Sequence, residues 1–186
     1  MKKYLWIVAL LVTGRAWAAG EFYVYEDKGS KLNHYIPSGW MGDVKDISYQ
    51  DAVKDNCKAG TCIKLVYTPR GDQGWAGVYW QHPANNWGAS AGGYDLSAYK
   101  KLTFWARADK SAVLDTVKMG GITGEHGDTD AVEMGPVEVT TKWQKFTLDL
   151  DSRNLAHIVG GFCWSASQSS NPDGFAVYLD EIRYER

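Results

Sequence analysis

The 186-residue sequence carries almost no excess charge of either sign. Lys and Arg number 20 and Asp and Glu number 22, so the formal net charge is −2. Charge-driven binding to nucleic acid or to an anionic membrane surface needs clustered Lys and Arg. We therefore expect neither kind of partner.

Long apolar runs are also missing. The first one, residues 4–12, is too short to span a bilayer, and no later one reaches that length, so no membrane span is expected. Lys2 and Lys3 precede this run, and Ala16-Trp17-Ala18 follows it, which is the arrangement of a secretory signal peptide. We predict a signal peptide over residues 1–18 and a secreted or periplasmic mature chain over residues 19–186.

Cysteine is scarce, with three residues in the chain. Export permits a disulfide, and three cysteines allow one bridge and one leftover thiol. Cys57 and Cys62 are separated by a turn-like Lys-Ala-Gly-Thr stretch and form the predicted pair, whereas Cys163 is expected to be a buried small hydrophobe. A Cys62–Cys163 bridge is the alternative, because spacing alone does not fix connectivity.

Helical periodicity is almost absent, apart from single helical turns expected at residues 96–101 and 153–157. β-branched, aromatic and alternating segments separated by Gly, Pro, Asn and Asp predict strands instead. The predicted strands are residues 22–25, 62–67, 77–81, 102–107, 137–140, 143–150, 158–164 and 175–182. Short strands at this spacing, without a linker or a repeat, predict one all-β domain: a jelly-roll β-sandwich of two antiparallel sheets.

Signals for catalysis are weak. Residues 88–92 match G-x-S-x-G, but that nucleophile motif needs a strand before it and a helix after it, and this segment has neither. The four His residues lack metal-ligand spacing. Carboxylates are plentiful, but nothing indicates which two would converge as a glycosidase requires. We predict that the protein is not an enzyme.

Aromatic residues, by contrast, are abundant, with 9 Trp and 11 Tyr. In an extended segment Trp75, Tyr79 and Gln81 share one face, and Trp87 follows in the next loop. Flat rings beside amides suit the apolar C–H faces and hydroxyl rims of sugars. Packing within a sandwich core explains any single one of these rings at least as well.

Residues 124–130, GEHGDTD, contain His126 and Asp128 among alternating acids. Three interpretations stay open for this loop. It can ligate Ca²⁺ through oxygen atoms, it can be a solvated acidic loop, or it can contact sugar hydroxyls.

Six motifs stand out along the chain: PSGWMGD at 37–43, WAGVYWQ at 75–81, NNWG at 85–88, LTFWAR at 102–107, GGFCW at 160–164 and YLDEI at 178–182. Together they resemble a family of exported, mostly uncharacterised bacterial proteins. More distantly, residues 95–105 and the Leu-Asp-x-Ile segment resemble the galactose-binding-like jelly rolls of carbohydrate-binding modules, including the β-glucan-binding family 11 type. This resemblance implies sugar binding and a structural Ca²⁺ held by Glu26 or Asp27 together with Asp180.

These observations predict an exported jelly-roll domain that binds an oligosaccharide or polysaccharide without transforming it. The predicted ligand contacts are stacking by Trp75, Tyr79, Trp87 and Trp164, and hydrogen bonding by Gln81, Arg107, His126 and Asp128. The alternatives are a carbohydrate hydrolase or lyase on the same fold, and an envelope module in which the same rings form a patch that binds another protein.

Overall fold

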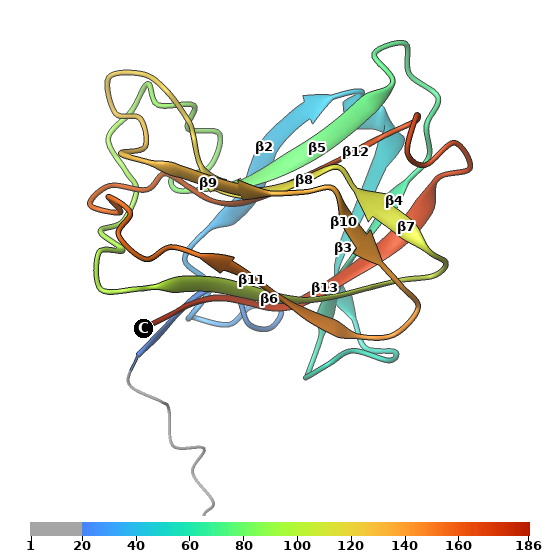
Figure 1. Cartoon of the computed structure of the whole chain (residues 1–186), viewed down its shortest axis with the longest axis horizontal. Helices are drawn as coiled ribbons and strands as arrows, with labels where there is room; N and C mark the ends of the chain where they lie inside the picture. The colour runs from blue at the N-terminus through green and yellow to red at the C-terminus, as the bar shows by residue number, and fades with distance from the viewer. Residues whose placement is uncertain (1–19) are drawn as a thin grey trace, which may run out of the picture.

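Two antiparallel sheets face each other in the computed structural model, which describes residues 20–186 (Figure 1). The predicted signal peptide, residues 1–18, lies outside the described residues. The first sheet, here called the β13 sheet, has the order β11 (Gln144–Asp149), β6 (Lys101–Ala108), β13 (Phe175–Glu185), β4 (Cys62–Tyr67) and β3 (Ile47–Val53), and β1 (Glu21–Tyr25) also pairs with β13.

The second sheet, here called the β5 sheet, has five strands. Its order is β2 (Ile36–Gly42), β5 (Trp75–Gln81), β12 (Gly160–Ser167), β8 (Thr116–Gly120) and β9 (Ala131–Met134). A small separate ladder joins β7 (Ala112–Leu114) to β10 (Val137–Val139), and a 3₁₀ turn, η1 (Val44–Asp46), precedes β3.

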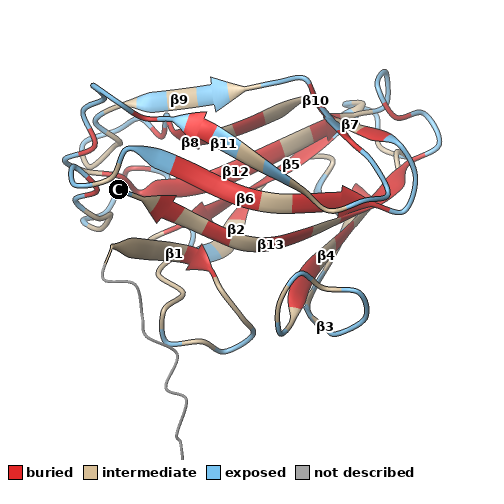
Figure 2. Cartoon of the chain, turned by 60° about the horizontal axis from the view of Figure 1, so that its bottom comes forward, coloured by how far each residue is buried: buried red, intermediate tan, exposed pale blue. Residues whose placement is uncertain are grey.

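The core lies between the two sheets because alternate residues of each strand point inward. In β6, Phe104 and Ala106 are fully buried, while Trp105 between them faces outward and is half-buried. Phe104 meets Phe162 of the opposite sheet with ring centroids 5.3 Å apart. Figure 2 shows buried positions along the strands of both sheets and exposed positions mainly in the loops. The predicted all-β sandwich is confirmed.

Some local predictions are wrong or missing. Residues 96–99 form a single turn, closed by the Tyr99 N–H and the Leu96 carbonyl at 2.9 Å, and residues 153–157 form none; η1 is the only helical segment in the described part of the chain. The strands β2, β3, β7, β8 and β9 were not predicted. β2 contains Pro37, Gly39 and Gly42, which obscure its strand pattern, and a register shift between Pro37 and Gly39 interrupts its pairing with β5.

The predicted disulfide is confirmed. Cys57 and Cys62 are bonded with their Cα atoms 5.4 Å apart, and Cys163 is a buried free thiol. No helix within residues 20–186 is long and apolar enough to cross a membrane.

Candidate ligand-binding face

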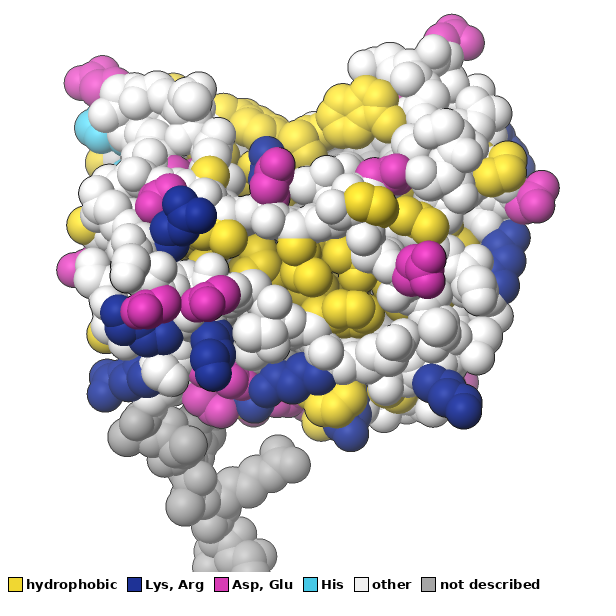
Figure 3. Space-filling view, viewed as in Figure 1, with side chains coloured by type: hydrophobic (Ala, Val, Ile, Leu, Met, Phe, Trp, Pro, Cys, Tyr) yellow, Lys and Arg dark blue, Asp and Glu magenta, His cyan; other side chains and the backbone are white. Residues whose placement is uncertain are grey.

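A hollow lies over the outer face of the β5 sheet. Figure 3 shows hydrophobic side chains gathered in a notch between two raised lobes. One lobe combines the loop after β5 with the loop after β8, where the backbone N–H of His126 donates to the Gly88 carbonyl at 2.9 Å. The other combines the loops before β5 and after β12, where the Gln168 N–H donates to the Gly74 carbonyl at 2.8 Å.

The floor of this hollow consists of outward-facing residues from neighbouring strands. Cross-strand register places one row in the order Met41, Gly77, Ser165 and Thr116, and a second row in the order Gly39, Tyr79, Cys163, Lys118 and Glu133. Gly77, at the centre, has no side chain. A Cβ there would lie 2.7 Å from the carbonyl oxygen of Trp164, so a larger residue does not fit. Gly39, Gly77, Tyr79 and Cys163 are buried, so the part of the floor that a ligand can reach consists of Met41, Ser165, Thr116, Lys118 and Glu133.

Two exposed indoles stand at the ends of this floor. Trp75, at the start of β5, is 38% exposed, and Trp87, in the loop after β5, is 45% exposed. The indole of Trp75 lies against β2, since a Cβ on Gly42 would be 3.0 Å from its Cδ2. Trp87 meets Tyr79 edge-on, with ring centroids 5.8 Å apart and planes at 84°. Four residues of strand separate Trp75 from Tyr79, roughly 13 Å at the rise of a β-strand.

Tyr79 supports Trp87 and does not itself offer a face to a ligand. It is only 3% exposed, and its hydroxyl donates to the Gly120 carbonyl at 3.0 Å. Burial raises the pKa of this phenol, so it stays neutral. The ammonium of Lys118 lies 5.2 Å from the ring centroid. The structure thus assigns Tyr79 a supporting role where the sequence predicted stacking.

The carboxylate of Asp128 organises the lobe that carries Trp87. It accepts hydrogen bonds from the backbone N–H of Ile122 at 2.7 Å, of Gly160 at 3.1 Å and of Val159. These bonds tie the loop after β8 to the start of β12. Burial raises the pKa of Asp128 although the three N–H donors oppose it. His126 is half-buried in the same lobe.

Three predicted contact residues are not part of this hollow. Gln81 is completely buried next to Gly39, and its Oε1 accepts from the Ser38 hydroxyl at 3.0 Å. Trp164 is completely buried because it points into the core, so its predicted role in stacking is wrong. Arg107 belongs to β6 and faces outward from the β13 sheet, on the opposite side of the sandwich.

Sequence reasoning missed Met41, Lys118, Ser165 and Glu133. Met41 belongs to β2, whose Pro and Gly residues obscure its strand pattern. Ser165, Lys118 and Glu133 lie in the floor because β12, β8 and β9 follow β5 in the sheet, an order set by strand pairing. No local pattern reveals those partners. Only Lys118, a charged residue between Val117 and Met119, carries a weak alternation signal.

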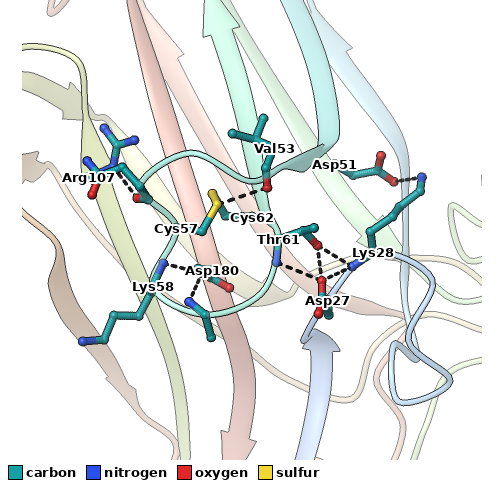
Figure 4. Close-up of a disulfide and its surroundings, with 12 residues drawn as sticks. Asp27, Lys28, Asp51, Val53, Cys57, Lys58, Thr61, Cys62, Arg107 and Asp180 are labelled. Atoms are coloured by element: carbon teal, nitrogen blue, oxygen red, sulfur yellow. Dashed lines mark hydrogen bonds and ion pairs between the residues drawn. A yellow bond between two sulfur atoms is a disulfide. The ribbon is translucent and has the colours of Figure 1, made fainter.

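The acids predicted to hold Ca²⁺ flank the disulfide loop, residues 57–62 (Figure 4). Asp180 is fully buried, and its carboxylate accepts the N–H groups of Lys58 at 2.8 Å, Ala59 at 3.0 Å and Glu181 at 2.9 Å. Burial raises the pKa of Asp180 to about 6, against the opposing effect of these donors. The loop therefore covers Asp180 on the outer face of β13.

Asp27 holds the other side of the same loop. Its Oδ1 accepts the N–H of Thr61 at 3.0 Å and of Lys28 at 2.8 Å, while Glu26 accepts from the Ser30 hydroxyl at 2.5 Å. Within residues 20–186, no three or more His, Cys, Asp or Glu side chains come together in one place. The backbone N–H groups direct their positive ends at these carboxylates, where they stabilise the negative charge and would repel a cation. This set of donors therefore does not fit Ca²⁺. Calcium binding stays a prediction of the sequence resemblance alone, and the N–H donors at these acids argue against it.

The comparisons with known proteins bear on the fold. No family model and no curated protein matches this chain. A solved family 30 carbohydrate-binding module is similar, with a TM-score of 0.61 and 13% identity over 90% of this chain and 88% of that one. The family 30 module of the cellulosomal cellulase Cel9D-Cel44B of Clostridium thermocellum is similar at a TM-score of 0.58 and 14% identity, over 88% and 96%.

A family 11 module from Clostridium thermocellum, solved with a β-1,3-1,4-mixed-linked tetrasaccharide, has a TM-score of 0.56 and 14% identity over 90% of this chain and 96% of that one. At such identities the likeness establishes the fold. The chain has the β-sandwich of these carbohydrate-binding modules, and the resemblance predicted from the sequence is confirmed at that level.

Proposed function

We propose that this protein binds an oligosaccharide or polysaccharide in the hollow over the β5 sheet and does not cleave it. One observation carries the proposal. Two indoles, 38% and 45% exposed, stand at opposite ends of a floor whose central residue, Gly77, has no side chain. Exposed rings that cost little entropy to hold in place are effective contacts for apolar ligand faces, such as the C–H face of a sugar.

Polar side chains beside the rings suit the hydroxyl rim of the same ligand. Lys118 and Glu133 are direct cross-strand partners at one edge of the floor, and Ser165 lies in the row next to them. An ammonium donates, a carboxylate accepts and a hydroxyl does both, so the three can match hydroxyls of either orientation. A few placed polar groups among apolar ones are typical of small-molecule sites.

The fold and the disulfide support this proposal. Several of the similar solved structures are carbohydrate-binding modules, one of them solved with a mixed-linked β-glucan tetrasaccharide, and two others are agarases, of which this chain covers 24% of the length. The Cys57–Cys62 bridge is compatible with an oxidising compartment, where polysaccharides are met outside the cytoplasm. We propose a secreted or periplasmic location on that ground.

The test is titration calorimetry of the mature chain with neutral oligosaccharides, beginning with a mixed-linked β-glucan tetrasaccharide, together with analysis of products after long incubation. We expect saturable binding and unchanged sugar. Release of shorter sugars would identify the alternative, an enzyme on this fold. If no neutral glycan of a broad panel binds, the proposal is wrong, and the protein-binding alternative for the two indoles is the next to test.

A further inference from the structure

A second hollow lies on the opposite side of the sandwich, over the outer face of the β13 sheet. Its volume is about 530 Å³, within the range of pockets that hold small ligands. Cross-strand register places four of its lining residues in one row over β3, β4, β13 and β6: Gln50, Lys64, Tyr178 and Arg107. Lys54, Asp55 and Asn56 close its rim.

Arg107 is the central residue of this hollow. Its side chain is nine-tenths buried, at 9% exposure for the residue. The guanidinium carbon lies 3.7 Å from the ring centroid of Tyr178 and 5.4 Å from that of Trp143. Its Nε donates to the Asn56 carbonyl at 3.3 Å, which also accepts from the Trp143 indole at 2.9 Å. The guanidinium is therefore fixed in position by two rings and one carbonyl.

No carboxylate within residues 20–186 forms an ion pair with this guanidinium. Among the ion pairs of residues 20–186, none includes Arg107, and its two terminal nitrogens make no hydrogen bond to a described residue. Burying a cation without a partner is unfavourable, because desolvation is not offset by attraction. An anionic ligand that enters the hollow would provide the missing partner.

The charge of the lining points the same way. Lys54, Lys64 and Arg107 face the hollow with one acid, Asp55, which leaves an excess of two positive charges in a chain whose net charge is −2. The ammonium of Lys64 lies 5.6 Å from the same Tyr178 ring on which Arg107 stacks. Two cations beside one ring repel each other, and a bound anion would relieve that repulsion.

We propose that this hollow binds the carboxylate of an acidic sugar, such as a uronic acid residue. A planar guanidinium with two free terminal nitrogens matches a planar carboxylate through a paired hydrogen bond. The side-chain amides of Gln50 and Asn56 are available to sugar hydroxyls at the rim. The proposal does not depend on Trp75 or Trp87, because those residues lie on the other sheet.

The test is a titration of the mature chain with an oligouronate, with the matched neutral oligosaccharide and with inorganic phosphate. The variants are Arg107→Gln and Lys64→Gln, and the control is Lys45→Gln, an exposed lysine in η1. We expect the oligouronate to bind, and its affinity to fall by about tenfold or more in Arg107→Gln. Lys64→Gln should weaken binding less, and Lys45→Gln should not change it.

Several results would overturn the proposal. Equal oligouronate affinity in Arg107→Gln and Lys45→Gln would remove Arg107 from the site. Loss of binding in Trp75→Ala alone would place the uronate in the other hollow. Phosphate that binds as tightly as the oligouronate would refute the preference for a carboxylate. The unfolding midpoint of each variant shows whether it is folded, and Lys64→Gln keeps the test valid if Arg107→Gln is not.

Discussion

Replacing Trp75 with Ala should weaken neutral glycan binding by an amount that the exposure of the ring sets. A tryptophan side chain offers up to about 250 Å² to solvent, so the 38% exposure of Trp75 corresponds to roughly 95 Å². A sugar that covers half of that area gains about 1.2 kcal/mol at about 25 cal/mol per Å², and one that covers all of it gains about 2.4 kcal/mol. The dissociation constant should therefore rise between about eightfold and about sixtyfold.

Titration calorimetry on the wild type and on Trp75→Ala measures this ratio directly. The matched control is Trp105→Ala, which removes an indole from the outer face of the β13 sheet, where it lies 4.2 Å from the ammonium of Lys58. The control should bind the neutral glycan as the wild type does. If Trp75→Ala folds normally and binds with unchanged affinity, or if both variants lose affinity equally, then Trp75 does not stack on the ligand and the reasoning fails.

Three further predictions concern the disulfide loop and its acids. Burial raises the pKa of Asp180 to about 6, so between about pH 4 and pH 6 the native state holds a proton that the unfolded chain has already released. The stability that this proton provides is lost as the pH rises through 6. The free energy of unfolding in urea should therefore fall over this pH range in the wild type and not in Asp180→Asn, and parallel profiles would refute the prediction. Replacing both Cys57 and Cys62 with Ser should lower the free energy of unfolding by about 2 kcal/mol, since the loop that the bridge closes is short. Unchanged stability in urea would contradict this. The same double variant should also weaken oligouronate binding, because the carbonyl of Asn56, next to the bridge, accepts a hydrogen bond from Arg107. EDTA followed by added Ca²⁺ should leave the unfolding midpoint unchanged, given the N–H donors at Asp180, whereas a midpoint that rises with Ca²⁺ would establish the calcium site that the sequence predicted.

The fold was predictable from the sequence wherever the residues of a strand alternate between apolar and polar. β4 alternates cleanly, and its predicted limits, residues 62–67, are those observed. β2 and the short strand β7 are held by partners farther along the sequence, β5 and β10, so their local composition says little about them. At residues 96–101 the chain makes one hydrogen-bonded turn, from the Tyr99 N–H to the Leu96 carbonyl at 2.9 Å, which does not continue as a helix, and Leu96 is buried in the core, a tertiary contact that its neighbours do not reveal.

The candidate site was predictable only in part, for a geometric reason. Alternation separates the two faces of a strand but does not say which face meets solvent. Trp75 is exposed as expected, because the opposite face of its strand, with Ala76, Val78 and Trp80, is apolar enough to indicate the core, whereas Trp164 sits on the inner face of β12 and was assigned to the wrong side. Arg107 was recognised as a ligand-binding candidate, but the sequence does not show that its strand belongs to the other sheet.

The position of β13 has a consequence for how the molecule is made. This strand pairs with β6 on one edge, and on the other edge first with β4 and then with β1, where Glu21 lies opposite Glu185. A nascent chain on the ribosome holds β1, β4 and β6 long before their shared partner exists. The sheet therefore cannot assemble from the N-terminus onward, and β1 must wait unpaired until β13 has been synthesised.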